Sequence, residues 1–203
     1  MGDDGNRCAP SAPATQADTL RSLLSQNGAI AAIVQRAPQL GLPQWYLGAG
    51  CIAQTVWNLR SGAPAMQHIV DYDPVYYDAA DLSETAEARQ AQRAAALFGD
   101  QRVRVDVKNQ ARVHLWYASR FGHAIAPYRS TRDAIDTWPT TATGVGIRTL
   151  DAGLALYAPF GNEDLLALIV RPNRRQITRD IYCAKVACWR ACWPALTIIP
   201  WDD

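Results

Sequence analysis

The stretch that decides the fold runs from residue 44 to residue 83 and reads QWYLGAGCIAQTVWNLRSGAPAMQHIVDYDPVYYDAADLS. It holds a short apolar segment, a Gly-Ala-Gly turn, a helix with one apolar face, a loop and then Asp71-Tyr72-Asp73. In a strand, residues i and i+2 point to the same face, so we expect both carboxylates on one side of a sheet. Two such carboxylates repel each other, and a cation between them relieves that repulsion. The pair therefore predicts a cation site.

Length and composition limit the remaining interpretations. The chain has 203 residues, of which 49% are hydrophobic and 19% charged, which suits one globular domain. A net charge of +1 creates no global field that attracts nucleic acid or membrane, so a long nucleic-acid partner is not indicated. No apolar run approaches the roughly 18–20 residues of a membrane span, and we expect no membrane partner. A small anionic ligand needs only local charge.

The two ends of the chain and the cysteines bear on organisation and location. Residues 1–16 are rich in Gly, Pro, Ala and Asp and are predicted to be a disordered leader, which leaves residues 17–203 as one domain with a C-terminal extension. The N-terminus lacks the basic and apolar segments of a signal peptide. Five cysteines, an odd number with irregular spacing, disfavour a secreted disulfide scaffold and match no zinc motif. The default expectation is a cytoplasmic protein. The cysteines are Cys8, Cys51, Cys183, Cys188 and Cys192.

Helical and strand patterns alternate along the chain. Apolar residues at helical spacing predict helices over 17–36 with a break near Gly28, 51–59, 81–97, 111–119, 130–138, 162–169 and 178–190. Strands are predicted over 45–47, 68–77 and 102–107, with a hairpin formed by 145–148 and 154–157. This order predicts an α+β (α/β-like) fold, in which a mixed sheet is flanked by helices.

The first candidate site combines the glycine turn with three acids. A helix N-terminus offers unpaired N–H groups, and Gly48 and Gly50 let a phosphate approach the backbone. Asp71 and Asp73 are hard oxygen ligands suited to Mg²⁺, and Asp106, on the strand predicted over 102–107, would complete a two-metal site. By spacing alone, the same residues also fit a turn followed by two acids that face solvent.

Longer strings of sequence resemble a known group of proteins. The glycine turn, the helix and the strand with alternating apolar and Asp residues resemble the signature of the DNA polymerase β-like nucleotidyltransferase superfamily. Five blocks also resemble a bacterial family of predicted nucleotidyltransferases: GAGCIAQTVWN at 48–58, DYDPVYYDAADLS at 71–83, VDVKNQARVHLWY at 105–117, YAPFGNEDLL at 157–166 and RPN at 171–173. The resemblance implies a mixed-sheet nucleotidyltransferase fold, Mg²⁺ as cofactor and a nucleoside triphosphate as substrate.

The resemblance also implies roles for individual residues. Asp71 and Asp73 match the paired metal carboxylates, Asp106 matches the third acid, and Gly48 matches the glycine of the phosphate turn. Two positions depart from the usual pattern. Ala49 stands where Gly or Ser is usual, so a hydroxyl that would touch phosphate is missing. Pro74 stands where an apolar strand residue is usual, and proline belongs at strand edges or bulges because it has no N–H.

A second group of candidate residues follows Asp106 directly. Lys108 and Arg112 are candidates to bind phosphate, and Gln110 and His114 to bind a base or an acceptor. On a helix, Gln110 and His114 are four residues apart and share a face. The same string also fits a polar helix start with a half-buried histidine. With Gly48, Ala49 and Gly50, these four residues form the predicted nucleotide-binding set.

These observations lead to one main hypothesis and two alternatives. The main hypothesis is Mg²⁺-dependent transfer of a nucleoside monophosphate from a nucleoside triphosphate to an unknown hydroxyl acceptor, with Asp71, Asp73 and Asp106 as catalytic and metal-binding residues. Ala49 and Pro74 motivate the first alternative, a nucleotide-binding module without turnover. The second alternative is a hydrolase with paired Asp residues as acid and base, which requires carboxylates separated across a cleft.

Overall fold

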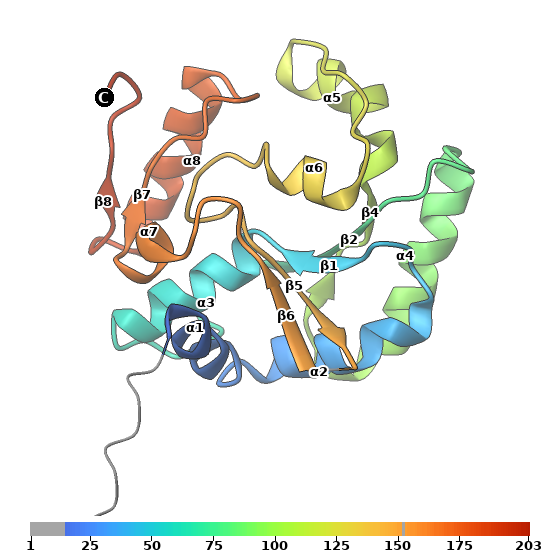
Figure 1. Cartoon of the computed structure of the whole chain (residues 1–203), viewed down its shortest axis with the longest axis horizontal. Coiled ribbons are helices and arrows are strands. Elements are labelled where there is room, and N and C mark those ends of the chain that lie inside the picture. Colours follow the sequence, from blue (N-terminus) through green and yellow to red (C-terminus); the bar gives the residue numbers. More distant parts are fainter. Residues whose placement is uncertain (1–14, 152) are drawn as a thin grey trace, which may run out of the picture.

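The computed structural model describes residues 15–151 and 153–203, and it contains a mixed sheet flanked by helices (Figure 1). The strand order is β3-β2-β1-β5-β6, and β4 also pairs with β2. The strands of this sheet are β1 (Tyr46–Gly48), β2 (Asp71–Tyr76), β3 (Arg104–Val105), β4 (Lys108–Asn109), β5 (Gly146–Leu150) and β6 (Gly153–Tyr157). β1 runs antiparallel to β2 and β5, whereas β2 runs parallel to β3 and β4. The predicted α+β class with a mixed sheet is confirmed.

The helices follow the predicted order closely. The α-helices are α1 (Gln16–Leu24), α2 (Gly28–Arg36), α3 (Gly50–Arg60), α4 (Glu84–Phe98), α5 (Val113–Phe121), α6 (Thr131–Ile135), α7 (Glu163–Leu166) and α8 (Arg179–Cys192), with 3₁₀ helices η1 (Ala37–Leu40), η2 (Gly99–Gln101) and η3 (Gln110–Arg112). The helix predicted over 17–36 is two helices, because the Asn27 side chain accepts hydrogen bonds from the N–H groups of Ala29 and Ile30 and so caps a second helix. Of the predicted leader, residues 1–14 lie outside the described residues, and Thr15 caps α1.

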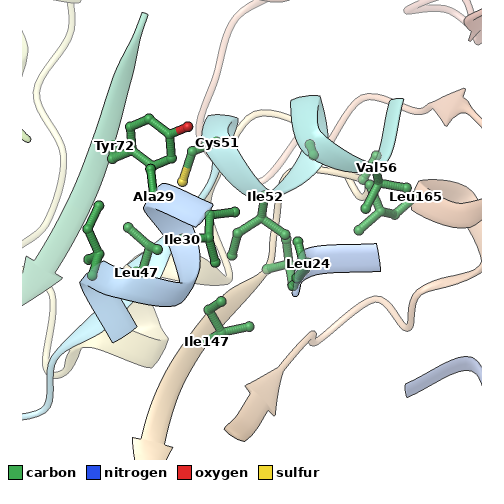
Figure 2. Close-up of a cluster of buried hydrophobic side chains, with 14 of the residues drawn as sticks. Leu24, Ala29, Ile30, Leu47, Cys51, Ile52, Val56, Tyr72, Ile147 and Leu165 are labelled. Atoms are coloured by element: carbon green, nitrogen blue, oxygen red, sulfur yellow. The ribbon is translucent and has the colours of Figure 1, made fainter. Parts of the chain in front are cut away.

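The main core fills one face of the sheet. In Figure 2, Ile52 of α3 lies beside Ile30 and Leu24 of the two N-terminal helices, and Val56 of α3 lies beside Leu165 of α7. Ile147 of β5 closes this cluster from the sheet. Burying an aliphatic side chain of this size stabilises a fold by roughly 1.5–3 kcal/mol, so this apolar layer holds α3 against the sheet.

The alternation of side chains along β2 separates the core from the acids. Tyr72 and Tyr76 are buried in the main core, so the intervening odd-numbered residues of β2 point to the opposite face. Val75 on that face packs with Tyr46 and Ile135 in a separate small cluster. Asp71 and Asp73 therefore lie on the sheet face away from the core, as their spacing predicts.

The strand predicted over 102–107 is interrupted, which corrects the sequence-based assignment. β3 and β4 pair with β2 in one continuous register, in which Asp71 lies opposite Arg104 and Val75 opposite Lys108. The gap between them falls opposite Pro74, which has no N–H to donate to a neighbouring strand. Pro74 thus lies in a central strand, β2, and the neighbouring strand is interrupted between β3 and β4 where it would pair with Pro74.

The C-terminal segment packs on the end of α3. Two strands, β7 (Ile169–Val170) and β8 (Thr197–Ile198), form a small parallel sheet that the sequence did not predict. The Trp193 indole N–H donates to the buried Asn58 Oδ1 at 2.7 Å, and Trp57 packs edge-on against Trp189 with ring centroids 5.3 Å apart. These contacts fix the position of α8. None of the described helices has both the length and the apolar character needed to cross a membrane.

Candidate active site

The three predicted acids meet where β2 passes the break between β3 and β4. The Asp106 N–H donates to the Tyr72 carbonyl oxygen at 2.9 Å, which places Asp106 alongside Asp73. Burial raises the pKa of Asp73 to about 7, and the negative charges of Asp71 and Asp106 contribute to that rise. Asp71, on the same strand as Asp73, and Asp106, beside it, thus both lie near enough to penalise a negative charge on Asp73. This clustering does not provide the separation across a cleft that a paired-Asp hydrolase requires.

Two cations of the chain itself partly neutralise Asp106. Lys108 Nζ lies 2.9 Å from Asp106 Oδ1, and Arg104 lies 3.6 Å from Oδ2. Both cations also counteract the rise in the pKa of Asp73. Within the described ranges, no three His, Cys, Asp or Glu side chains are grouped closely enough to hold a metal ion as they stand. Asp106 thus forms ion pairs with Lys108 and Arg104, and it is not grouped with the other acids in a geometry that would already hold a metal ion.

The glycine turn lies directly beside these acids. Gly48 pairs with Asp73 across β1 and β2. A Cβ atom on Gly48 would lie 2.3 Å from the Trp138 ring, so only glycine fits under this indole. Sequence reasoning assigned Gly48 to phosphate approach, and the structure adds that Trp138 packing requires it.

Ala49 adopts a conformation that disfavours any residue with a Cβ. Its φ is 55° and its ψ is −122°, a combination that costs an L-residue about 1–3 kcal/mol. The Ala49 N–H donates to the Val145 carbonyl at 3.1 Å, so that N–H is already satisfied. No side chain caps the start of α3 at this position. The N–H groups of the first turn of α3 are therefore the backbone donors available to an anion.

A pocket of about 310 Å³ opens at the turn and at Asp73, whereas Asp71 and Asp106 do not line it. Ala49, Asp73 and Lys108 form one part of its lining, and Gln110 lies beside them. The remaining wall is mostly apolar and comes from the segments around α5, α6 and α8. It consists of Val75, Val113, Trp116, Tyr117, Phe121, Tyr128, Thr137, Trp138, Pro139, Gln176, Ile177, Ile181 and Lys185. One pocket thus joins a charged end to an aromatic end.

Lys185 is a site residue that sequence reasoning missed. It lies on α8, far along the chain from the acids, and lines the same pocket as Asp73. Burial lowers the pKa of Lys185, and Arg120 lowers it further, whereas Asp73 and Asp71 act in the opposite direction. Lys185 is nevertheless an exposed residue of α8, so solvent limits this effect. No local motif identifies this lysine, because tertiary packing of α8 brings it to the acids.

Two predicted nucleotide-binding residues have other surroundings. Arg112 donates to the Leu82 carbonyl at 2.8 Å and pairs with Glu87, and only 6% of its side chain is exposed. It therefore joins η3 to α4 and does not line the pocket. Gln110 and His114 do not share a helical face, because Gln110 belongs to η3 and His114 to α5. Gln110 lines the pocket, whereas His114 does not.

Comparison with known proteins identifies the family and the fold of the chain. A family model described as nucleotidyltransferase matches residues 35–198. A solved structure, described as an NMR structure that reveals a CCA-adding enzyme head domain, is similar over 92% of this chain and 96% of its own, with 25% identity and a TM-score of 0.75. No curated protein matches the chain. The chain belongs to the nucleotidyltransferase family.

Proposed function

We propose that this enzyme transfers a nucleoside monophosphate from a nucleoside triphosphate to a hydroxyl acceptor, with Asp71, Asp73 and Asp106 as the catalytic acids. The observation that carries the proposal is the single pocket lined by Ala49, Asp73, Lys108 and Lys185. The acceptor oxygen forms a bond to the α-phosphorus while the bond from that phosphorus to the pyrophosphate oxygen breaks. The hydroxyl proton passes to a base or to water, and pyrophosphate leaves.

The residues present fit a divalent cation. Asp71, Asp73 and Asp106 offer hard oxygen donors, and their mutual repulsion, seen in the raised pKa of Asp73, favours a positive charge among them. Bound Mg²⁺ would neutralise phosphate charge and lower the pKa of the attacking hydroxyl. Asp106 would exchange its ion pairs with Lys108 and Arg104 for the cation, which frees both basic groups to face phosphate.

The chain's own residues have distinct roles in this proposal. The N-terminus of α3 and the amines of Lys108 and Lys185 bind the triphosphate, because phosphoryl transfer depends on positioning and charge neutralisation. Asp71 and Asp73 hold the cation from β2, which the main core keeps rigid. A cytoplasmic location remains the expectation for this reaction.

Titration calorimetry with Mg²⁺ and each nucleoside triphosphate tests binding, and pyrophosphate release tests turnover. We expect binding of at least one triphosphate by the wild type and loss of pyrophosphate release in Asp73→Asn. Absence of binding by a folded sample contradicts the proposal.

A nucleotide-binding module without turnover is the second candidate. Two features favour it. Ala49 has no side-chain hydroxyl to touch phosphate, and its backbone N–H already donates to Val145. Asp106 is held by an ion pair with Lys108. This candidate predicts triphosphate binding that survives Asp73→Asn, together with no pyrophosphate release by the wild type. The two candidates therefore differ in whether the wild type releases pyrophosphate.

A further inference from the structure

The pocket beside Asp73 has two chemically different ends. The charged end holds Asp73, Lys108 and Lys185, and the charges of Asp73 and Asp71 act on Lys185. Away from it, α5 and α8 each direct one face toward the pocket. Trp116, Tyr117 and Phe121 lie on one face of α5, and Ile177, Ile181 and Lys185 follow one another at four-residue spacing along α8 and the residues just before it. A ligand bound along the pocket therefore passes from charged groups to aromatic ones.

The aromatic end is closed by a hydrogen-bonded group. The Tyr128 hydroxyl lies 2.9 Å from Thr137 Oγ1, and it contacts Gln176 Oε1 at 2.9 Å and Nε2 at 2.7 Å. Tyr117 packs at 4.6 Å from the Phe121 ring centroid and at 5.2 Å from that of His123. These contacts hold the wall in place before any ligand arrives, and a preformed wall lowers the entropic cost of binding.

One buried polar group in the lining has spare hydrogen-bonding capacity. Gln110 is only 6% exposed. Its Nε2 makes a long contact of 3.5 Å with the Lys108 carbonyl, and within residues 15–151 and 153–203 its Oε1 receives no hydrogen bond. Gln110 Oε1 is not enclosed by the protein, so a ligand in the pocket can donate a hydrogen bond to it. A nucleobase edge offers both the donor and the acceptor that a carboxamide needs.

We propose that the aromatic end of this pocket, between α5 and α8, binds the nucleobase of the triphosphate and that Gln110 hydrogen-bonds the nucleoside. The proposal rests on the proposed function, because it assumes that the triphosphate occupies the charged end. A base has a flat π-face that stacks on aromatic rings, and the pocket volume of about 310 Å³ is within the usual range for small ligands. The phosphates cannot occupy this end, because charged oxygens gain nothing from apolar walls.

A neighbouring groove does not offer the same continuity. A second groove of about 500 Å³ shares Lys108 and Trp116 with the pocket but contains neither Ala49 nor Asp73. Its lining includes Glu84, Glu87, Arg112 and Arg120, which carry charges of both signs. The nucleoside is covalently attached to the phosphates and must share their pocket.

The test places a bulky side chain in the aromatic end of the pocket. It then compares nucleoside triphosphates with inorganic tripolyphosphate, which lacks the nucleoside. Ile181→Trp narrows the pocket, and Ala187→Trp, an exposed position on another face of α8, is the matched control. Binding of each nucleoside triphosphate and of inorganic tripolyphosphate is measured by calorimetry with Mg²⁺. We expect Ile181→Trp to lose at least about tenfold in affinity for the nucleoside triphosphates, to keep tripolyphosphate within about twofold, and the control to change neither.

The outcomes separate this inference from the proposed function. Unchanged nucleoside triphosphate binding by Ile181→Trp overturns the inference, and so does equal loss of both ligands. If the wild type binds tripolyphosphate as tightly as every nucleoside triphosphate, the inference is overturned, although the phosphate-binding site is still supported. Wild-type protein that binds neither ligand contradicts the proposed function itself.

A second variant tests the role of Gln110. Gln110→Glu removes the amide donor, and we expect it to change the ratio of affinities among the four triphosphates. A uniform change in all four contradicts the role given to Gln110.

Discussion

At the scale of single residues, Asp73 carries the clearest physical signature in the site. It lies among two other carboxylates and is partly shielded from water, and both conditions penalise its charged form. Its pKa of about 7 in the folded chain is well above the ordinary 3.8. The folded protein therefore holds this proton more tightly than the unfolded chain does. The stability of the metal-free protein should fall as pH rises from about 4 to about 7.

Replacing Asp73 by Asn removes this penalty. We expect Asp73→Asn to be more stable than the wild type at pH 8 without metal, by at most about 4 kcal/mol, and to differ little at pH 4. Mg²⁺ should raise the melting temperature of the wild type at pH 8, because a ligand that binds the folded state stabilises it, and should leave the variant unchanged. Urea denaturation at both pH values measures the effect. The exposed Asp151→Asn serves as control, and a destabilised Asp73→Asn at pH 8 would contradict the account.

Ala49 makes a second prediction at this scale. Its φ of 55° with ψ of −122° is a conformation that glycine adopts without steric strain. We expect Ala49→Gly to stabilise the protein by about 1 kcal/mol, measured as a shift of the urea midpoint. Ala95→Gly, at an exposed position inside α4, is the control and should destabilise by about 1 kcal/mol. Equal losses in both variants would show that Ala49 is not strained.

At the scale of elements, the ion pair between Arg112 and Glu87 joins η3, which directly precedes α5, to α4. Arg112 has 6% of its side chain exposed and Glu87 has 15%. Removing one partner leaves the other charge without compensation in a poorly solvated place. We expect Arg112→Ala to lower the free energy of unfolding by about 3–5 kcal/mol.

The exposed pair of Arg129 and Asp133 provides the control for this prediction. Arg129 has 87% of its side chain exposed, and surface pairs of this kind contribute less than about 1 kcal/mol. Arg129→Ala should therefore change the urea midpoint only slightly. If Arg112→Ala costs no more than Arg129→Ala, Arg112 does not hold the two helices together, and its assignment to phosphate binding becomes the better interpretation.

The same scale shows which features the sequence predicts and which it does not. The spacing of Asp71 and Asp73 was enough to predict their common face, since the period of a strand is fixed by its geometry. The break between β3 and β4 was not predicted, because the missing N–H belongs to Pro74 on a neighbouring strand. Alternating Val103, Val105 and Val107 in the sequence indicated one continuous strand instead. Pairing partners, unlike periodicity, are not visible in a local pattern.

Site residues divide in the same way. The glycine turn and the paired acids belong to short local motifs, and their positions followed from the sequence. Arg112 belongs to such a motif too, yet its partner Glu87 lies on a different helix and draws it away from the pocket. Lys185 belongs to no motif and reaches the pocket because Trp193 and Asn58 fix α8 against α3. Long-range packing therefore decides which charged residues face the site.

At the scale of the whole molecule, the two faces of the sheet have different roles. One face carries the main core, with α3 packed on it (Figure 2). The other carries the acids, and α5, α6 and α8 with their flanking residues supply the wall of the adjoining pocket. The core contributes stability and fixes β2, so the acids are held by a rigid strand. The helices on the acid face are free to determine which nucleoside and which acceptor enter.

The measurement that tests the central claim most directly is transfer of label from nucleoside triphosphates carrying radioactive phosphorus in the α-phosphate. Each triphosphate is incubated with Mg²⁺, a cell extract as the source of acceptors, and either the wild type or a variant that combines Asp71→Ala with Asp73→Ala. We predict a labelled product with at least one triphosphate that depends on both the wild-type enzyme and Mg²⁺. No product with any triphosphate, or equal labelling by the double variant, would contradict the claim that these acids catalyse nucleotidyl transfer.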